Sequence, residues 1–327
     1  MDVERITFLV GAVIGVPLVL VLYIVGTDWL IRRLPEAYHA RVRPWFWVGP
    51  ALLLVTGFLI YPGIATAWIS LLTNDGRSFV GLANFGQVLS DNSVLIAIRN
   101  NILWLVFYTA FVLAFGLVLA VMADRVPYEG PVKSLIFMPM AISFVAAGLI
   151  WRFMYAYRPP LPGVAQTGTL NALVVNLFHQ QPVSWIIDER INNFALIFAA
   201  VWVWTGFAMV ITSASLKGIP PELLEAARVD GATELQVFRR ITVPLLAPTL
   251  TVIGTTLVIF ALKAFDIVYI MTNGLYNTDV MARRMYGEMF NNLNYARSAA
   301  IAVLLLLAVV PVLIFNLRRF QFQEAIR

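Results

Sequence analysis

Residues 219–244 read IPPELLEAARVDGATELQVFRRITVP, a polar and helix-prone stretch that separates two long apolar runs. Pro220 and Pro221 suit the start of a helix, because the first turn has no use for the N–H that proline lacks. Glu222 and Glu225 follow in the first turns, where the positive end of the helix dipole favours a carboxylate. The stretch therefore predicts a short helix that begins directly after Pro220.

A turn and a second short helix are expected to follow. Asp230-Gly231 is a turn signal, and glycine adopts a left-handed turn at almost no cost. Thr233 can cap the second helix, which carries Arg239 and Arg240 near its end. Residues 219–244 thus predict a helix–glycine–helix elbow at a membrane surface.

The composition predicts an all-α, polytopic membrane protein. Of the 327 residues, 60% are hydrophobic and 13% are charged, whereas soluble domains carry about 25% charged residues. The absence of cysteine excludes disulfides, thiolate metal sites and a cysteine nucleophile. His39 and His179 fall in different loops, which argues against a histidine metal cluster. In so apolar a chain, the net charge of +5 is expected to set topology and not to bind nucleic acid.

Several apolar runs reach the length of about 20 residues that crosses a bilayer of roughly 30 Å. The seven runs are 6–31, 45–72, 101–123, 134–157, 194–216, 249–272 and 299–317. The first is interpreted as a retained helix and not a signal peptide, because no small-residue cleavage site follows it. Pro50 and Pro62 are expected to kink the second or delay its start. A short helix is expected near 170–178, in a loop that could equally receive a partner or serve as a lid.

The distribution of Lys and Arg predicts the orientation. If the elbow is cytoplasmic, the inner segments are 32–44, 124–133, 217–248 and 318–327. These segments hold 13 Lys and Arg in 65 residues, against 8 in the 95 residues of the outer segments. By the positive-inside rule the N-terminus is then outside and the C-terminus cytoplasmic.

The spacing within the elbow resembles the Glu-Ala-Ala motif of bacterial ABC importer permeases. The matched residues are Glu225, Ala226, Ala227, Gly231, Ile241 and Pro244, with Val243 where the motif has Leu. The resemblance implies a coupling helix that docks into a cleft on a cytoplasmic ATPase. It extends the expected coupling set to Glu222 and Asp230. The alternative is an ordinary amphipathic loop at the interface.

More of the chain, about residues 45–327, resembles the sugar branch of this family. The stretches that carry the resemblance are Asn100-Asn101, 135–144, Trp202 with Gly206-Phe207, 263–274 and the tail from Phe290 to Phe320. Their order is most similar to permeases of alpha-glucoside importers, for trehalose, maltose or sucrose. The resemblance implies a six-span permease domain at 45–327, preceded by an extra helix and cytoplasmic loop at 1–44. It also implies a bacterial plasma-membrane location, a second permease, two ABC ATPase subunits and an extracytoplasmic sugar-binding protein.

No phosphate-binding loop of the Gly-x-x-x-x-Gly-Lys-Ser/Thr type occurs, because the stretch 130–134 lacks the spacing. We therefore expect a transport subunit that is not itself an enzyme and binds no cofactor. ATP and Mg²⁺ would be used by the partner ATPases, and energy would arrive through the elbow.

The candidate substrate path lies in the fifth and sixth spans. Lys263 and Asp266 are ionisable residues three positions apart, expected on one face of a helix, where they either pair structurally or line the path. Trp204, Phe207 and Phe260 coincide with positions that the resemblance implies are cavity-facing, and aromatic rings can cover the apolar C–H faces of a sugar. Competing hypotheses are import of another polar solute such as a polyol, a membrane glycosyl-transfer enzyme, and a passive channel.

Overall fold

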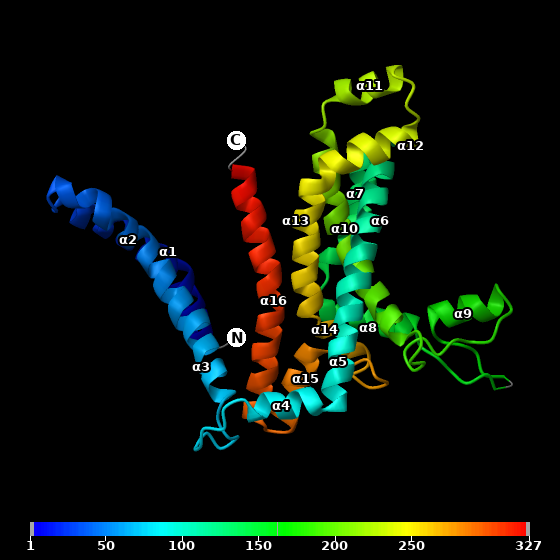
Figure 1. The fold of residues 1–327 in the computed structure, drawn as a ribbon, viewed down its shortest axis with the longest axis horizontal. Coiled ribbons are helices and arrows are strands. Elements are labelled where there is room, and N and C mark those ends of the chain that lie inside the picture. Colours follow the sequence, from blue (N-terminus) through cyan, green and yellow to red (C-terminus); the bar gives the residue numbers. More distant parts are fainter. Residues whose placement is uncertain (1–2, 162, 325–327) are drawn as a thin grey trace. The chain divides into compact units, whose positions relative to one another are not determined.

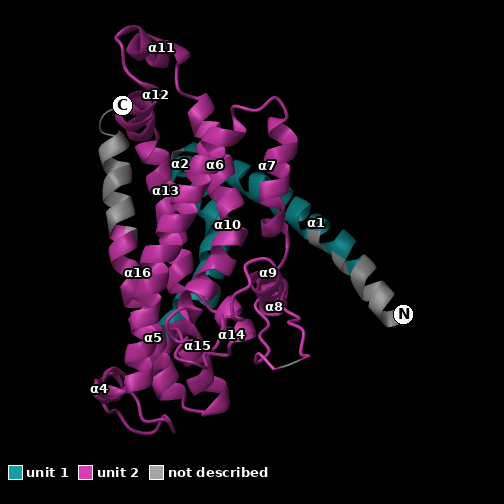
Figure 2. Cartoon of the chain, turned by 90° about the vertical axis from the view of Figure 1, so that its right-hand side faces the viewer, with its two compact units in different colours: residues 1–65 teal, residues 66–327 magenta. Residues whose placement is uncertain are grey.

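A computed structural model describes residues 3–161 and 163–324 (Figure 1). Two compact units make up the chain, residues 1–65 and residues 66–327 (Figure 2). Nearly all regular structure is helical, and the β pairing of the described residues is limited to one isolated bridge between Leu72 and Phe79. The all-α prediction is confirmed, whereas the expected domain boundary at residue 44 stays a prediction.

The first unit consists of long apolar helices. Helix α1 spans Val3–Arg32 and α2 spans Glu36–Val55; a π-helical turn at Thr56–Ile60 leads into α3, Tyr61–Ile69. The widened turn directly precedes Pro62, which cannot donate to the carbonyl one turn earlier. None of the most apolar stretch of Tyr38–Ile69 is buried. Its apolar side chains therefore need lipid or another chain around them.

Helix α10, Asn192–Lys217, is the centre of the second unit. Two thirds of its most apolar stretch is buried, far more than in any other described span. It packs against α6, Thr109–Ala123, which continues α5, Asn92–Leu103, through a π-helical turn. It also packs against α13, Val243–Leu262, which follows α12, Glu234–Val237, and another π-helical turn. Helix α16, Tyr295–Glu324, packs against α13 (Figures 1 and 2). A helix buried on most sides lacks a polar face, which is why α10 reads as continuously apolar.

Glycines allow the backbones around α10 to approach closely. A Cβ on Gly116 of α6 would lie 2.5 Å from the Cβ of Ala208, and a Cβ on Gly206 would lie 2.6 Å from the carbonyl oxygen of Ile136. Close backbone contact through small residues is the usual means of packing helices in a membrane. Gly206 therefore allows α10 to pack closely against the backbone at Ile136 and Phe137.

The expected fourth span is bent. Helix α7, Glu129–Phe137, runs into a 3₁₀ turn at Met138–Ala141, and α8, Phe144–Met154, leaves at 99°. Pro139 lies in the 3₁₀ turn, and Ser143 begins α8 as a cap, accepting from the N–H of Ala146 at 3.2 Å. The described residues thus hold six long apolar helices, or seven if the bent pair counts as one span. The span predicted at 134–157 is thus a bent pair of helices, in which the proline and the cap form the corner.

The expected sixth span is broken as well. Helix α13 ends at Leu262, and α14, Asp266–Met271, starts after a three-residue gap. Asn101 of α5 donates from its Nδ2 to the carbonyl oxygens of Ala261 and Leu262, at 3.2 and 3.4 Å. These are terminal carbonyls that have lost their helical partners. A continuous helix over 249–272 is therefore a wrong prediction, and an asparagine from another span satisfies the break.

Short helices gather at the end of the second unit away from the elbow, called here the opposite end (Figure 1). They are α4, Ala83–Ser90; α9, Thr169–Asn176; α14; and α15, Met281–Tyr286, followed by a π-helical turn at Gly287–Asn291. The α9 bounds confirm the short helix expected near 170–178.

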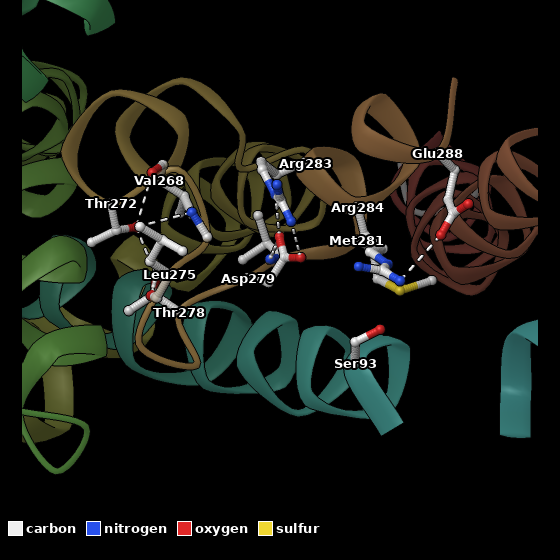
Figure 3. A network of polar contacts seen from close by, with 12 residues as sticks. Ser93, Val268, Thr272, Leu275, Thr278, Asp279, Met281, Arg283, Arg284 and Glu288 are labelled. Atoms are coloured by element: carbon white, nitrogen blue, oxygen red, sulfur yellow. Dashed lines mark hydrogen bonds and ion pairs between the residues drawn. The ribbon is translucent and has the colours of Figure 1, made fainter. Parts of the chain in front are cut away.

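Four charged residues at the opposite end form an alternating ring, called here the charge ring. Arg284 and Arg297 each reach both carboxylates: Asp91 at 3.3 and 2.6 Å, and Glu288 at 3.1 and 3.8 Å. Figure 3 shows the Arg284–Glu288 pair next to the Asp279–Arg283 pair on the same helix. Glu288 is only 2% exposed, so its charge depends on the two arginines. The ring ties the start of α5 to α15, to the π-helical turn and to α16.

Candidate functional site

The predicted elbow forms at residues 219–244. Pro220 lies in an extended conformation immediately before α11, Pro221–Val229. Thr233 then caps α12 in a capping box, in which its hydroxyl accepts from the N–H of Gln236 and the Gln236 side chain accepts from the N–H of Thr233. Both helix starts are therefore encoded by local residues.

The glycine between the two helices closes α11 with a Schellman motif. Gly231 has φ of +84°. Its N–H donates to Arg228 O and the N–H of Ala232 donates to Ala227 O, both at 3.0 Å. These bonds satisfy carbonyls at the end of α11 that have no helical partner. The Ala-Ala pair and the glycine keep a fixed spacing because Ala227 and Gly231 belong to one hydrogen-bonded motif.

The elbow presents its polar residues to the surroundings. No residue of α11 is buried, and Val229 is 88% exposed. An ion pair between Arg228 and Glu234, at 2.6 Å, spans the turn. Of the expected coupling set, the exposed members are Glu222, Glu225, Ala226, Asp230, Gly231 and Pro244, and the half-buried ones are Ala227 and Ile241. The described elbow is thus a surface that lacks a partner within the chain, and its coupling role stays a prediction.

A polar cluster, called here the elbow root, holds the end of α10 from which the elbow departs. The Lys133 ammonium contacts the carboxylates of Asp124 and Glu129 and the hydroxyl of Ser213. Ser213 also donates to Asp124 at 2.6 Å, and Lys217 reaches Glu129 at 2.5 Å. The elbow root therefore links α10 to the connection between α6 and α7 through Ser213 and Lys217, which lie shortly before the elbow begins at residue 219.

A cavity of about 260 Å³ lies beside the break between α13 and α14. Six of its thirteen lining residues are aromatic, and two are charged. The residues that line it are Trp104, Tyr108, Phe144, Ala200, Trp204, Ile259, Phe260, Ala261, Lys263, Ala264, Phe265, Asp266 and Ile267. Its volume lies just below the lower end of the range of small-ligand sites.

The cavity brings together four of the five predicted path residues: Trp204, Phe260, Lys263 and Asp266. The rings of Trp204 and Phe260 are 4.0 Å apart at a tilt of 53°. Phe207 stands behind this wall, with its ring edge-on to Trp204 at 5.2 Å. The aromatic part of the prediction is therefore a contiguous surface, with Phe207 as its support.

Lys263 and Asp266 lie differently from the prediction. Lys263 is in the gap after α13 and Asp266 is the first residue of α14, so they do not share one helical face. Both side chains are exposed, and no ion pair joins these two described residues. The reading of a structural ion pair is wrong because the break in the helix separates them, and both line the cavity.

The predicted path residues did not include four aromatic residues of the wall, one of which is Phe265 in the gap before α14. Trp104 and Tyr108 come from the π-helical turn between α5 and α6, and Phe144 is the first residue of α8. Phe144 stacks on Trp204 at 6.3 Å. The extra residue of a π-helical turn shifts which side chains face inward, and helical periodicity of 3.6 residues cannot anticipate it.

The helical bundle shares its fold with a chain of a solved ABC transporter. A chain in the crystal structure of a bacterial alginate ABC transporter, in complex with alginate pentasaccharide-bound periplasmic protein, matches with a TM-score of 0.74 and 21% sequence identity. The match covers 86% of this chain and 95% of that chain. At this identity the likeness shows the fold alone.

Sequence comparison defines the family. Residues 113–323 match the family described as binding-protein-dependent transport system inner membrane component, and the chain belongs to that family. The chain is 50% identical to the osmoprotective compounds uptake permease protein GgtC of Synechocystis sp. over 281 residues, 86% of this chain and 100% of that protein. It is 46% identical to the alpha-glucoside transport system permease protein AglF of Rhizobium meliloti, over 85% of this chain and 82% of that protein. The permease resemblance drawn from the elbow is confirmed.

Proposed function

We propose that this chain is the permease subunit of an ABC importer that carries a sugar, of the alpha-glucoside class of trehalose, maltose or sucrose. The aromatic cavity around Trp204 carries the proposal. The ring centroids of Trp204 and Phe260 are 4.0 Å apart, and together the two rings form a wall against which the apolar C–H face of a pyranose can pack. Lys263 can donate to sugar hydroxyls and Asp266 can accept from them. The similarity to AglF supports the same solute class.

The elbow would receive the energy for transport. ATP and Mg²⁺ would be bound by two partner ATPase subunits, since this chain lacks a phosphate-binding loop. Docking of the exposed α11 into an ATPase cleft would move the end of α10, which the elbow root links to α6 and α7. Rocking of these helices against a second permease would open the cavity to alternate sides, after delivery of the solute by an extracytoplasmic binding protein.

A second candidate solute is an osmoprotective compound, in the class of small polar solutes such as polyols. The 50% identity to GgtC over all of that protein favours it. The same cavity would serve, because Lys263 and Asp266 can hydrogen-bond to the hydroxyls of such a solute. The two candidates differ in the solute and share the transport mechanism.

The solute is identified by uptake into proteoliposomes that contain the assembled transporter and its binding protein. Labelled trehalose, maltose, sucrose and a polyol are compared, each with unlabelled competitors. We expect one of them to be taken up in an ATP-dependent manner, and the Trp204→Ala variant to lose most of that uptake. Uptake of none of the four, from a complex whose ATPase responds to its binding protein, would refute the solute class.

Coupling is tested separately with two elbow variants. Glu225→Lys reverses a charge on the docking surface, and Gly231→Trp puts a side chain at a positive φ that favours glycine. Both should abolish uptake while the chain still inserts in the membrane. Normal uptake by both would show that the elbow does not transmit force.

We further infer that the N-terminus lies outside and that the elbow and C-terminus are cytoplasmic, from the Lys and Arg distribution. The chain has no cysteine, so single cysteines can be introduced for labelling. A cysteine at Val3 should react with an impermeant maleimide added outside, and one at Glu225 only after permeabilisation. The reverse pattern would overturn the orientation.

A further inference from the structure

Four aromatic rings form a continuous row at the opposite end, called here the aromatic ladder: Phe265, Tyr269, Tyr286 and Phe290. Phe265 stacks on Tyr269 at 5.2 Å and lies 5.4 Å from Tyr286. Tyr269 and Tyr286 are 5.5 Å apart, and Tyr286 lies 4.7 Å from Phe290. Each distance is within the range of direct ring contact. The ladder joins the break before α14 to the π-helical turn after α15.

The two ends of the aromatic ladder lie in different places. Phe265 lines the cavity. Phe290 is 58% exposed, and Tyr269 is 36% exposed. An aromatic cluster that only packs the fold would bury its rings, because burial is the source of its stabilising effect. These rings instead leave part of their surface free along a row that begins at the cavity.

Polar groups accompany the rings. The hydroxyls of Tyr269 and Tyr286 share a hydrogen bond, which raises the pKa of Tyr286. Arg283 lies close enough to Tyr269 for a charge interaction, and Asp279 holds the guanidinium at 2.6 Å (Figure 3). Rings with nearby hydroxyl and guanidinium donors are suited to a solute that has both an apolar face and hydroxyls.

The backbone under the aromatic ladder is fixed. Arg152 of α8 donates to the carbonyl oxygen of Ile270 at 3.3 Å. Asn100 of α5 donates to the carbonyl oxygens of Asn277 and Asp279, both at 2.7 Å. The rings are therefore presented by segments that the neighbouring spans hold in position.

We propose that the aromatic ladder is a binding track for pyranose rings, along which a solute passes between the opposite end and the cavity. The track would act by successive contacts of the apolar C–H face of the sugar with Phe290, Tyr286 and Phe265, with the phenol and guanidinium groups contacting hydroxyls. This inference rests on the proposed function, and it adds a site outside the cavity.

The experiment compares leucine and aromatic replacements in the reconstituted transporter. Phe290→Leu and Tyr286→Leu keep apolar volume and remove the ring face, whereas Phe290→Tyr and Tyr286→Phe keep it. We expect each leucine variant to lower the initial uptake rate about fivefold to tenfold, in line with the loss of one aromatic contact. The aromatic variants should stay within about twofold, and ATPase stimulation by the loaded binding protein should persist in all four. Phe79→Leu, at an exposed ring outside the ladder, is the matched control and should transport normally.

The outcomes separate the two proposals. Wild-type complex that takes up no sugar would refute the proposed function, and the track with it. Wild-type uptake together with normal uptake by both leucine variants would refute the track alone. Loss of uptake in leucine and aromatic variants alike, with a lowered melting temperature, would make the rings structural and overturn the track as well. If Tyr286→Leu does not assemble, the more exposed Phe290→Leu decides.

Discussion

The two ends of the second unit handle charge in opposite ways. At the elbow, Arg228 and Glu234 pair across an exposed turn, and no residue of α11 is buried. At the opposite end, Glu288 is nearly inaccessible and is surrounded by two arginines. An exposed pair contributes little to stability, whereas breaking a buried one is costly. The difference indicates that the elbow is formed to meet another surface, and that the segment 273–294 belongs to the packed bundle.

The largest expected effect is at Glu288. Glu288→Ala leaves Arg284 and Arg297 facing each other in a partly buried site. We expect the complex to lose about 3 kcal/mol of stability, measured by thermal or denaturant unfolding in detergent. The matched control is Glu222→Gln on the elbow, which should change stability by less than about 0.5 kcal/mol. Equal effects of the two substitutions would remove the contrast between the ends.

The pH dependence of stability tests the same charge ring at Asp91. Burial acts to raise the pKa of this carboxyl, but hydrogen bonds from Ser93 and Arg297 outweigh it and lower the pKa from 3.8 to about 2. A lowered pKa in the folded state stabilises the fold above pH 3.8, and this contribution is lost as the pH falls through about 2. The loss should amount to about 2 kcal/mol.

The free energy of unfolding, measured between pH 5 and pH 2, should decline in this way in the wild-type protein. The decline should be smaller in the Asp91→Asn variant. An unchanged slope in the variant would show that other carboxylates cause the decline.

A smaller effect is expected at the elbow root. Lys133→Met removes the cation that contacts Asp124, Glu129 and Ser213. The site is partly open, so we expect a loss of about 1.5 kcal/mol, by the same unfolding measurement. Lys217→Met, whose side chain is 57% exposed, should cost only a few tenths of a kcal/mol. A larger loss of stability in Lys217→Met than in Lys133→Met would contradict the central role of Lys133 in the elbow root.

Local sequence predicted much of the fold and less of the cavity. The elbow was predicted correctly from the two prolines, the capping threonine and Gly231, because each of these residues determines the backbone conformation of only a few neighbours. The corner at Pro139 and the break after Leu262 were missed. The corner is formed by Pro139 and the local cap Ser143, whereas the break is satisfied by a partner distant in the chain, Asn101, 160 residues away from Ala261.

The same limit explains the errors at the candidate site. Trp204 and Phe260 were found through the resemblance to the permease family, and their rings meet in the folded chain. Trp104 and Tyr108 were missed because a π-helical turn reorients them. Lys263 and Asp266 were placed on one helical face because the helix was assumed to continue. The break that separates Lys263 from Asp266 is stabilised by hydrogen bonds from a distant residue, Asn101. The periodicity of a single segment carries no information about such bonds.

One amide at the centre of the bundle sets a chemical condition on that position. Asn101 donates from its Nδ2 toward Ala261 O and Leu262 O, and its Oδ1 accepts from the N–H of Met281 at 2.8 Å. The amide cannot be rotated by 180°, because its oxygen would then face two carbonyl oxygens and its NH₂ group would face an N–H. Deamidation to aspartate, a change of one atom, would aim a second acceptor at two carbonyl oxygens. Direction of hydrogen bonding, and not size, therefore excludes aspartate here: deamidation of this single side chain would remove the donor to the end of α13 and keep the acceptor for the N–H of Met281, the first residue of α15.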